Sequence, residues 1–86
     1  MPEISRFFGI VIKMFFDDHN PPHFHAEYAD DLALIEIRNL SVFSGRLPPR
    51  AIGLVIEWAT LHQQELLADW ERAQAQEQLH KIAPLE

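Results

Sequence analysis

Hydrophobic and polar positions alternate in short runs over the first half of the chain and follow a helical period over the second. Residues 5–16 are rich in β-branched and aromatic side chains that would make both sides of an extended chain apolar, which predicts a strand covered on two faces. Residues 23–28, HFHAEY, alternate strictly and place His23, His25 and Glu27 on one side of a strand. Two further strands are predicted at residues 32–38 and 41–44.

From Ala51 onward the apolar residues recur every three to four positions, as in a helix with one apolar side. The preceding LPPR segment supplies proline for a first helical turn, where its missing N–H costs nothing. We therefore predict one helix over residues 49–75 and a tail over 76–86. The 86 residues form a single domain of the α+β class, a small antiparallel meander of three to four strands with one long C-terminal helix packed on one face.

One helix covers only one face of a sheet, yet the first predicted strand is apolar on both. Unless the tail folds back over the open face, a second molecule has to cover it, and burial of a few hundred Å² contributes several kcal/mol at roughly 25 cal/mol per Å². We therefore predict a protein-binding module that forms a homodimer or binds a small partner protein. The predicted contact residues are Phe7, Val11, Phe15, His23, His25 and Glu27.

Composition narrows the class of partner and the compartment. Thirteen acidic and seven scattered basic residues give a formal charge of -6, which argues against nucleic acid as a partner. The absence of cysteine excludes disulfides and thiolate zinc sites and fits a reducing compartment. The Met-Pro-Glu start is unlike a secretory signal, and the apolar runs are too short to span a membrane. A cytoplasmic protein is expected.

The segment DDHNPPHFHAEY concentrates histidines and carboxylates. Two residues apart on a strand, His23 and His25 project from one face with backbones about 6.6 Å apart, so both imidazoles can reach one ion. With His19 from the loop and Asp18, they form a candidate site for zinc or another divalent transition metal, although the sequence requires no cofactor. The same residues also suit the polar side of a hairpin, with a structural or interface role, and both interpretations stay open.

A metal-independent ribonuclease is a weaker alternative. It would need a general base, a general acid and a cation beside the phosphate, for which His23 or His25, Tyr28 and Arg6 or Arg46 could serve. The overall acidity argues against it, and the three serines lie in no nucleophile motif. The sequence therefore favours a non-enzymatic role and identifies no catalytic residue.

Four segments, ISRFFGIVIKMFF, DHNPPHFHAEY, LPPRA and EWATLHQQELLADWERA, resemble in this order the bacterial domain-of-unknown-function family 4160. The resemblance runs from Ile4 to about Leu85, and Asn-Pro-Pro-His-Phe-His is its most specific part. It implies a short protein often encoded beside another small protein, in pairs that have been suggested to act as toxin–antitoxin-like modules. It supplies no catalytic residue. The chain departs from the family pattern at RNLS, residues 38–41, where relatives more often have a glycine-containing turn.

Overall fold

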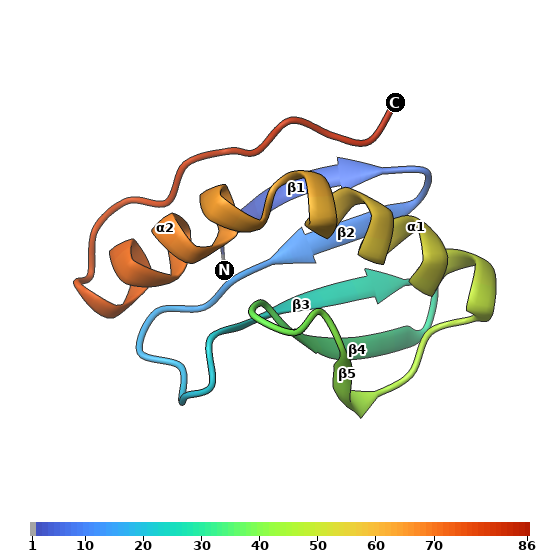
Figure 1. Ribbon diagram of the computed structural model, residues 1–86, viewed down its shortest axis with the longest axis horizontal. Coiled ribbons are helices and arrows are strands. Elements are labelled where there is room, and N and C mark those ends of the chain that lie inside the picture. The colour runs from blue at the N-terminus through green and yellow to red at the C-terminus, as the bar shows by residue number, and fades with distance from the viewer. Residues whose placement is uncertain (1) are drawn as a thin grey trace.

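The computed structural model describes residues 2–86, which form one antiparallel sheet covered by two helices (Figure 1). The strands are β1 (Glu3–Phe7), β2 (Ile10–Lys13), β3 (His23–Tyr28), β4 (Asp31–Glu36) and β5 (Val42–Gly45), and the helices are α1 (Pro49–Leu61) and α2 (Gln63–Gln74). The strands pair in chain order as a meander. The predicted α+β class and meander are confirmed, but there are five strands and two helices instead of three to four strands and one helix.

The strand predicted over residues 5–16 is in fact a hairpin. Phe8 and Gly9 both have positive φ, 50° and 80°, as in the two-residue turns that match the twist of paired strands. Phe7 of β1 consequently pairs with Ile10 of β2, and both side chains are buried in the core. The placement of Phe7 on an open face was therefore wrong. The chain turns directly after Phe7. The strict alternation of a single strand over residues 5–16, which would place Phe7 on the outer face, therefore does not apply.

The predicted long helix is interrupted at His62, whose φ of −122° is not helical. The His62 N–H is shared between the carbonyls of Trp58 and Ala59, and its Nδ1 lies 2.6 Å from Glu65 Oε1. The side-chain amide of Gln63 donates to the carbonyl of Ile37, 2.8 Å away, at the end of the sheet. This contact ties the first residue of α2 to the end of the sheet.

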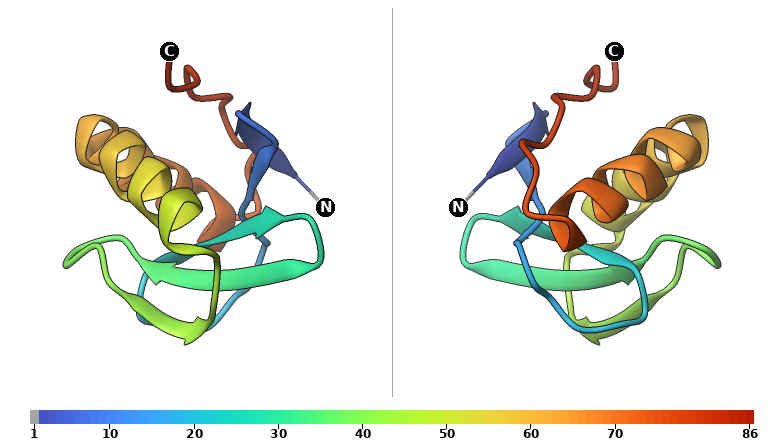
Figure 2. Two further views of the ribbon diagram at one scale, coloured as in Figure 1. Left: turned by 90° about the vertical axis from the view of Figure 1, so that its right-hand side faces the viewer. Right: turned by 90° about the vertical axis from the view of Figure 1, so that its left-hand side faces the viewer.

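The core lies between the helices and one face of the sheet. Trp58 of α1 is fully buried and contacts the rings of Phe7 and Phe24, with centroids 5.3 and 5.9 Å away. The tail after α2 folds back beside β1, as both views in Figure 2 show, and the Ile82 N–H donates to the carbonyl of Ile4 at 2.8 Å. The indole N–H of Trp58 donates to the carbonyl of Ala83 at 2.8 Å. The tail is therefore part of the folded domain.

The tail packs on the side of the sheet that faces the helices, since Ile82 belongs to the core and the Ala83 carbonyl accepts a hydrogen bond from Trp58 of α1. In the strand register, Val11 of β2 lies opposite Glu27 of β3, and Lys13 lies opposite His25. Lys13 and Glu27 form a salt bridge of 3.0 Å across these strands. The outer face is thus a mixture of apolar and charged side chains. Within residues 2–86, neither helix is long and apolar enough to cross a membrane.

Candidate metal centre

Three potential metal ligands meet where the loop between β2 and β3 enters β3. The Nε2 atoms of His23 and His25 lie 3.0 and 3.2 Å from the same oxygen, Oδ2 of Asp18. Among residues 2–86, these three side chains form the group whose ligand atoms all lie within 4.8 Å of one another. The spacing of the histidines follows from the strand, since residues two apart project from the same face. The carboxylate comes from the loop.

The loop holds Asp18 in place by hydrogen bonds at both ends of the residue. Its side-chain Oδ1 accepts the N–H of His19 at 3.0 Å, which leaves Oδ2 for the two imidazoles. Its backbone carbonyl accepts a hydrogen bond from the side-chain amide of Gln74, at the end of α2, at 3.1 Å. The second helix therefore helps to position a residue of the cluster that is 56 positions away in the chain.

The imidazole of His23 is oriented by the backbone. Its Nδ1 lies 2.8 Å from the carbonyl oxygen of Pro21, which can only accept a hydrogen bond, so Nδ1 carries the proton. In the neutral ring, Nε2 then presents its lone pair toward Asp18. A backbone carbonyl that binds the second ring nitrogen of a histidine is the usual outer partner of a metal ligand, because it sets the tautomer and the ring direction.

Aromatic rings enclose the cluster. His23 is only 5% exposed and lies with its ring centroid 5.3 Å from Trp70 of α2 and 5.2 Å from Phe43 of β5. Phe15 meets His25 edge-on at 4.4 Å. These contacts restrict the rotation of both imidazoles and lower the local dielectric, which strengthens the interaction of the ligands with a cation.

The environment favours the protonation states that metal ligands need. Burial lowers the pKa of His25 below its ordinary value and outweighs the opposing effect of Asp18, so this ring tends to be neutral. Partial burial alone would raise the pKa of Asp18. Hydrogen bonds from His25 and the His19 N–H, with the charges of His23 and His25, nevertheless lower it below its ordinary value. An ionised carboxylate beside a neutral imidazole is what a divalent metal requires.

The geometry also fits the size of a metal ion. Donor atoms about 2.0–2.2 Å from zinc, at tetrahedral angles, lie roughly 3.3 Å from each other. The separations of 3.0 and 3.2 Å between each Nε2 and Asp18 Oδ2 are close to this value, so small side-chain movements would suffice. Two histidines and one carboxylate leave further coordination positions for water or another ligand.

The structure separates the predicted ligands. Asp18, His23 and His25 come together, whereas His19 is exposed and not part of the group. The reason is local: the His19 N–H bonds to its neighbour's carboxylate, and its ring is left outside the loop. The helical layer also reaches the histidines, since Trp70 of α2 lies with its ring centroid 5.3 Å from that of His23.

Residues proposed for contact or catalysis are distributed over the molecule. Val11 and Phe15 are half-buried, and Glu27 forms the salt bridge with Lys13 on the outer face. For ribonuclease chemistry, Arg6 instead pairs with Glu3 at 2.8 Å, and Tyr28 lies at the other end of β3 from His23. The site residues that sequence reasoning missed are Trp70 and Phe43, whose aromatic character was visible but whose position depends on the tertiary fold.

Fold and cluster together define a small α+β domain with two histidines and one carboxylate converging at one end of a five-stranded meander. The chain belongs to the family described as domain of unknown function (DUF4160), whose model matches residues 9–71. The predicted family resemblance is thereby confirmed. The matched range includes the whole cluster. No curated protein and no solved structure matches the chain significantly.

Proposed function

We propose that this protein binds a divalent transition metal ion, with zinc as the best fit, through Asp18, His23 and His25. The observation that supports this most directly is the convergence of both Nε2 atoms on one carboxylate oxygen, at 3.0 and 3.2 Å, while Nδ1 of His23 is engaged by the Pro21 carbonyl. A neutral His23 would direct a lone pair at a negative oxygen. This arrangement is favourable only with a positive charge between the two atoms, either a proton or a metal ion.

The metal hypothesis is tested by zinc titration calorimetry on untagged protein that has been treated with a chelator. We expect one zinc ion per chain, and we expect His25→Ala and Asp18→Asn each to weaken binding by about 100-fold or more, since even outer-shell changes typically cost 10–100-fold. His19→Ala is the matched control, because it removes a neighbouring exposed histidine outside the group, and its affinity should be that of the wild type.

Circular dichroism should show that each variant is folded before its affinity is compared. If the wild type binds no zinc, nickel, cobalt or iron, or if the His19→Ala and His25→Ala proteins bind equally well, the assignment of these three ligands is wrong. In that case the cluster has a structural role.

The pH dependence of the metal-free protein gives a second test. Burial lowers the pKa of His25, whereas the hydrogen bond and charge of Asp18 raise it, so Asp18→Asn should lower this pKa still further. In the wild type, the folded-state pKa of His25 lies below the ordinary value of 6.5, so the unfolded chain takes up a proton on this ring at a higher pH than the folded chain. The contribution of His25 to stability therefore falls as the pH drops from 6.5 toward the folded-state pKa. NMR titration of the imidazole resonances measures the shift. An unchanged or higher pKa in Asp18→Asn would contradict this account of the site.

We also propose that the protein is a binding module that associates with a second copy of itself at the β4–β5 edge of the sheet. This edge exposes three large apolar side chains, Leu32, Val42 and Phe43, at 45%, 38% and 44%. All four residues of β5 are exposed, so the strand presents a free edge. The toxin–antitoxin-like pairing implied by the family resemblance is a further proposal that would use the same surface.

Size-exclusion chromatography with light scattering tests the self-association. A dimer should have twice the chain mass of 10.0 kDa, and Leu32→Lys should shift it toward the monomer. Leu61→Lys is the control, because Leu61 is 67% exposed and belongs to α1, not to β4 or β5. A wild-type protein that stays monomeric at high concentration, or a dimer disrupted equally by both changes, would contradict the proposed interface.

A further inference from the structure

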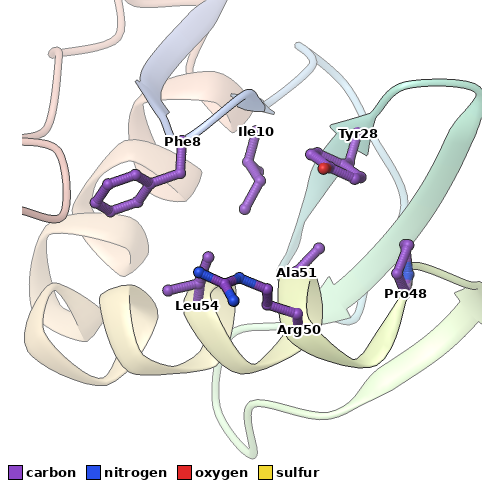
Figure 3. Close-up of a pocket in the computed structure, with 7 residues that line it drawn as sticks. All are labelled: Phe8, Ile10, Tyr28, Pro48, Arg50, Ala51 and Leu54. Carbon is purple, nitrogen blue, oxygen red and sulfur yellow. The ribbon is translucent and has the colours of Figure 1, made fainter.

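A second candidate site lies at the other end of β3. A hollow of about 590 Å³ opens between the β1–β2 turn, the last residue of β3 and the first turns of α1 (Figure 3). Since β3 runs from His23 to Tyr28, the two ends are separated by about 17 Å at 3.3 Å per residue. The hollow is therefore distinct from the histidine cluster.

The hollow is apolar at its base and aromatic at its sides. Ile10 and Ala51 form the base, and they are 0% and 4% exposed. Phe8 and Tyr28 stand on either side of Ile10 and face α1 across the hollow, as Figure 3 shows. Phe8 is 60% exposed because it occupies the tight turn, where its ring cannot reach the core. A ring-sized apolar group placed between these walls would remove their apolar surface from water.

Arg50 is the charged residue of the lining and determines which ligands fit. Its side chain lies along α1 beside Leu54, at the margin of the hollow (Figure 3). The salt bridges within residues 2–86 occupy Arg6 and Arg72 but do not involve Arg50. In a chain with a formal charge of -6, an arginine without a carboxylate partner above an apolar hollow is complementary to an external anion.

The dipole of the adjacent helix α1 also favours a bound anion. The first turn of α1 carries no acidic residue that would neutralise the positive end of the helix dipole. The volume falls within the range of about 300–1,000 Å³ that is typical of small-molecule sites. A single guanidinium matches one carboxylate through two parallel hydrogen bonds, whereas a polyphosphate would need several cations.

We propose that this hollow binds a small molecule with an apolar, ring-sized body and a single carboxylate. The body lies between Phe8 and Tyr28 over Ile10, and the carboxylate pairs with the guanidinium of Arg50. The site has no residue in common with Asp18, His23 and His25, so it does not depend on metal binding.

The test uses three probes and NMR spectra of the full chain in the presence of a chelator, which prevents the probes from binding through a metal ion. The probes are 3-phenylpropionate, the uncharged 3-phenylpropanol, and acetate. A carboxylate probe of this size should bind with a dissociation constant in the millimolar range. We expect it to shift the amide resonances of Gly9, Tyr28 and Ala51, and to bind at least about tenfold more tightly than either of the other probes.

Arg50→Gln should weaken 3-phenylpropionate binding about tenfold and leave 3-phenylpropanol unaffected, because it removes only the charge. Arg46→Gln is the matched control, since Arg46 is an exposed arginine four positions earlier and outside the lining, and it should bind the probe as the wild type does. Equal binding of acid and alcohol, or no effect of Arg50→Gln, would overturn the proposal. If the same resonances shift on concentration of the protein alone, a second copy occupies the hollow, and the proposal is also wrong.

Discussion

Replacement of Trp58 by alanine should destabilise the protein by about 3–5 kcal/mol, the range found for large aromatic side chains in cores. Trp58 is 0% exposed and packs against Phe7 and Phe24, so its removal leaves a cavity between helix and sheet. It also deprives the Ala83 carbonyl of its hydrogen-bond donor. A domain of this length has a total stability of roughly 4–13 kcal/mol, so a large part of it would be lost.

Urea denaturation followed by circular dichroism measures this loss, and Trp58→Phe is the matched control. Phenylalanine keeps an aromatic ring in the core but cannot donate to Ala83, and should cost only about 1–2 kcal/mol. If the alanine and phenylalanine variants have the same denaturation midpoint, the buried ring does not stabilise the fold in the way that its contacts indicate.

Two glycine-to-alanine substitutions should change stability in opposite directions. Gly45 has a φ of +74°, and a Cβ there would lie 2.1 Å from the backbone oxygen of Leu32, so β5 would have to move away from β4. We expect Gly45→Ala to cost at least about 2 kcal/mol, the sum of an unfavourable backbone conformation and this displacement. For a domain of this size, the melting temperature should fall by about 10 °C or more.

Gly53 is the contrasting position, because it lies in α1 and a Cβ there would meet no atom within 4 Å. Alanine should stabilise the helix by about 0.5–1 kcal/mol, because it loses less backbone entropy on folding. Scanning calorimetry of both variants would show a lower melting temperature for Gly45→Ala and a higher one for Gly53→Ala. If both melting temperatures changed in the same direction, the contacts described for Gly45 and Gly53 would be contradicted.

Much of the fold could be predicted because periodicity reports directly on secondary structure. The alternation in HFHAEY identifies β3 with its bounds, and the helical period locates the helical region from Pro49 onward. The break at His62 could not be predicted, because neither proline nor glycine marks it. Directly after it, Gln63 makes hydrogen bonds to the end of the sheet, and such tertiary contacts leave no local pattern in the sequence. The β1–β2 turn was missed although it contains Gly9, because Phe8 is not a typical turn residue and the apolar run continues on both sides.

The candidate site was predictable to the extent that it depends on one strand. His23 and His25 share a face of β3 because they are two residues apart, and this holds in any register. The choice between Asp18 and His19 as the third member depends on the backbone of the loop, which sequence spacing does not determine. The enclosure of His23 by Trp70 depends in turn on the direction of α2 after the helix break.

The return of the tail to β1 has a consequence for the order of events in folding. The Lys81 side chain donates to the carbonyl of Glu3, 78 positions earlier, so these contacts close a loop of nearly the entire chain. Loop closure is entropically costly, and such distant partners should meet late, after the transition state. The last residues would then govern how slowly the domain opens and not how fast it forms. In stopped-flow kinetics, Ile82→Ala should accelerate unfolding and leave the refolding rate nearly unchanged.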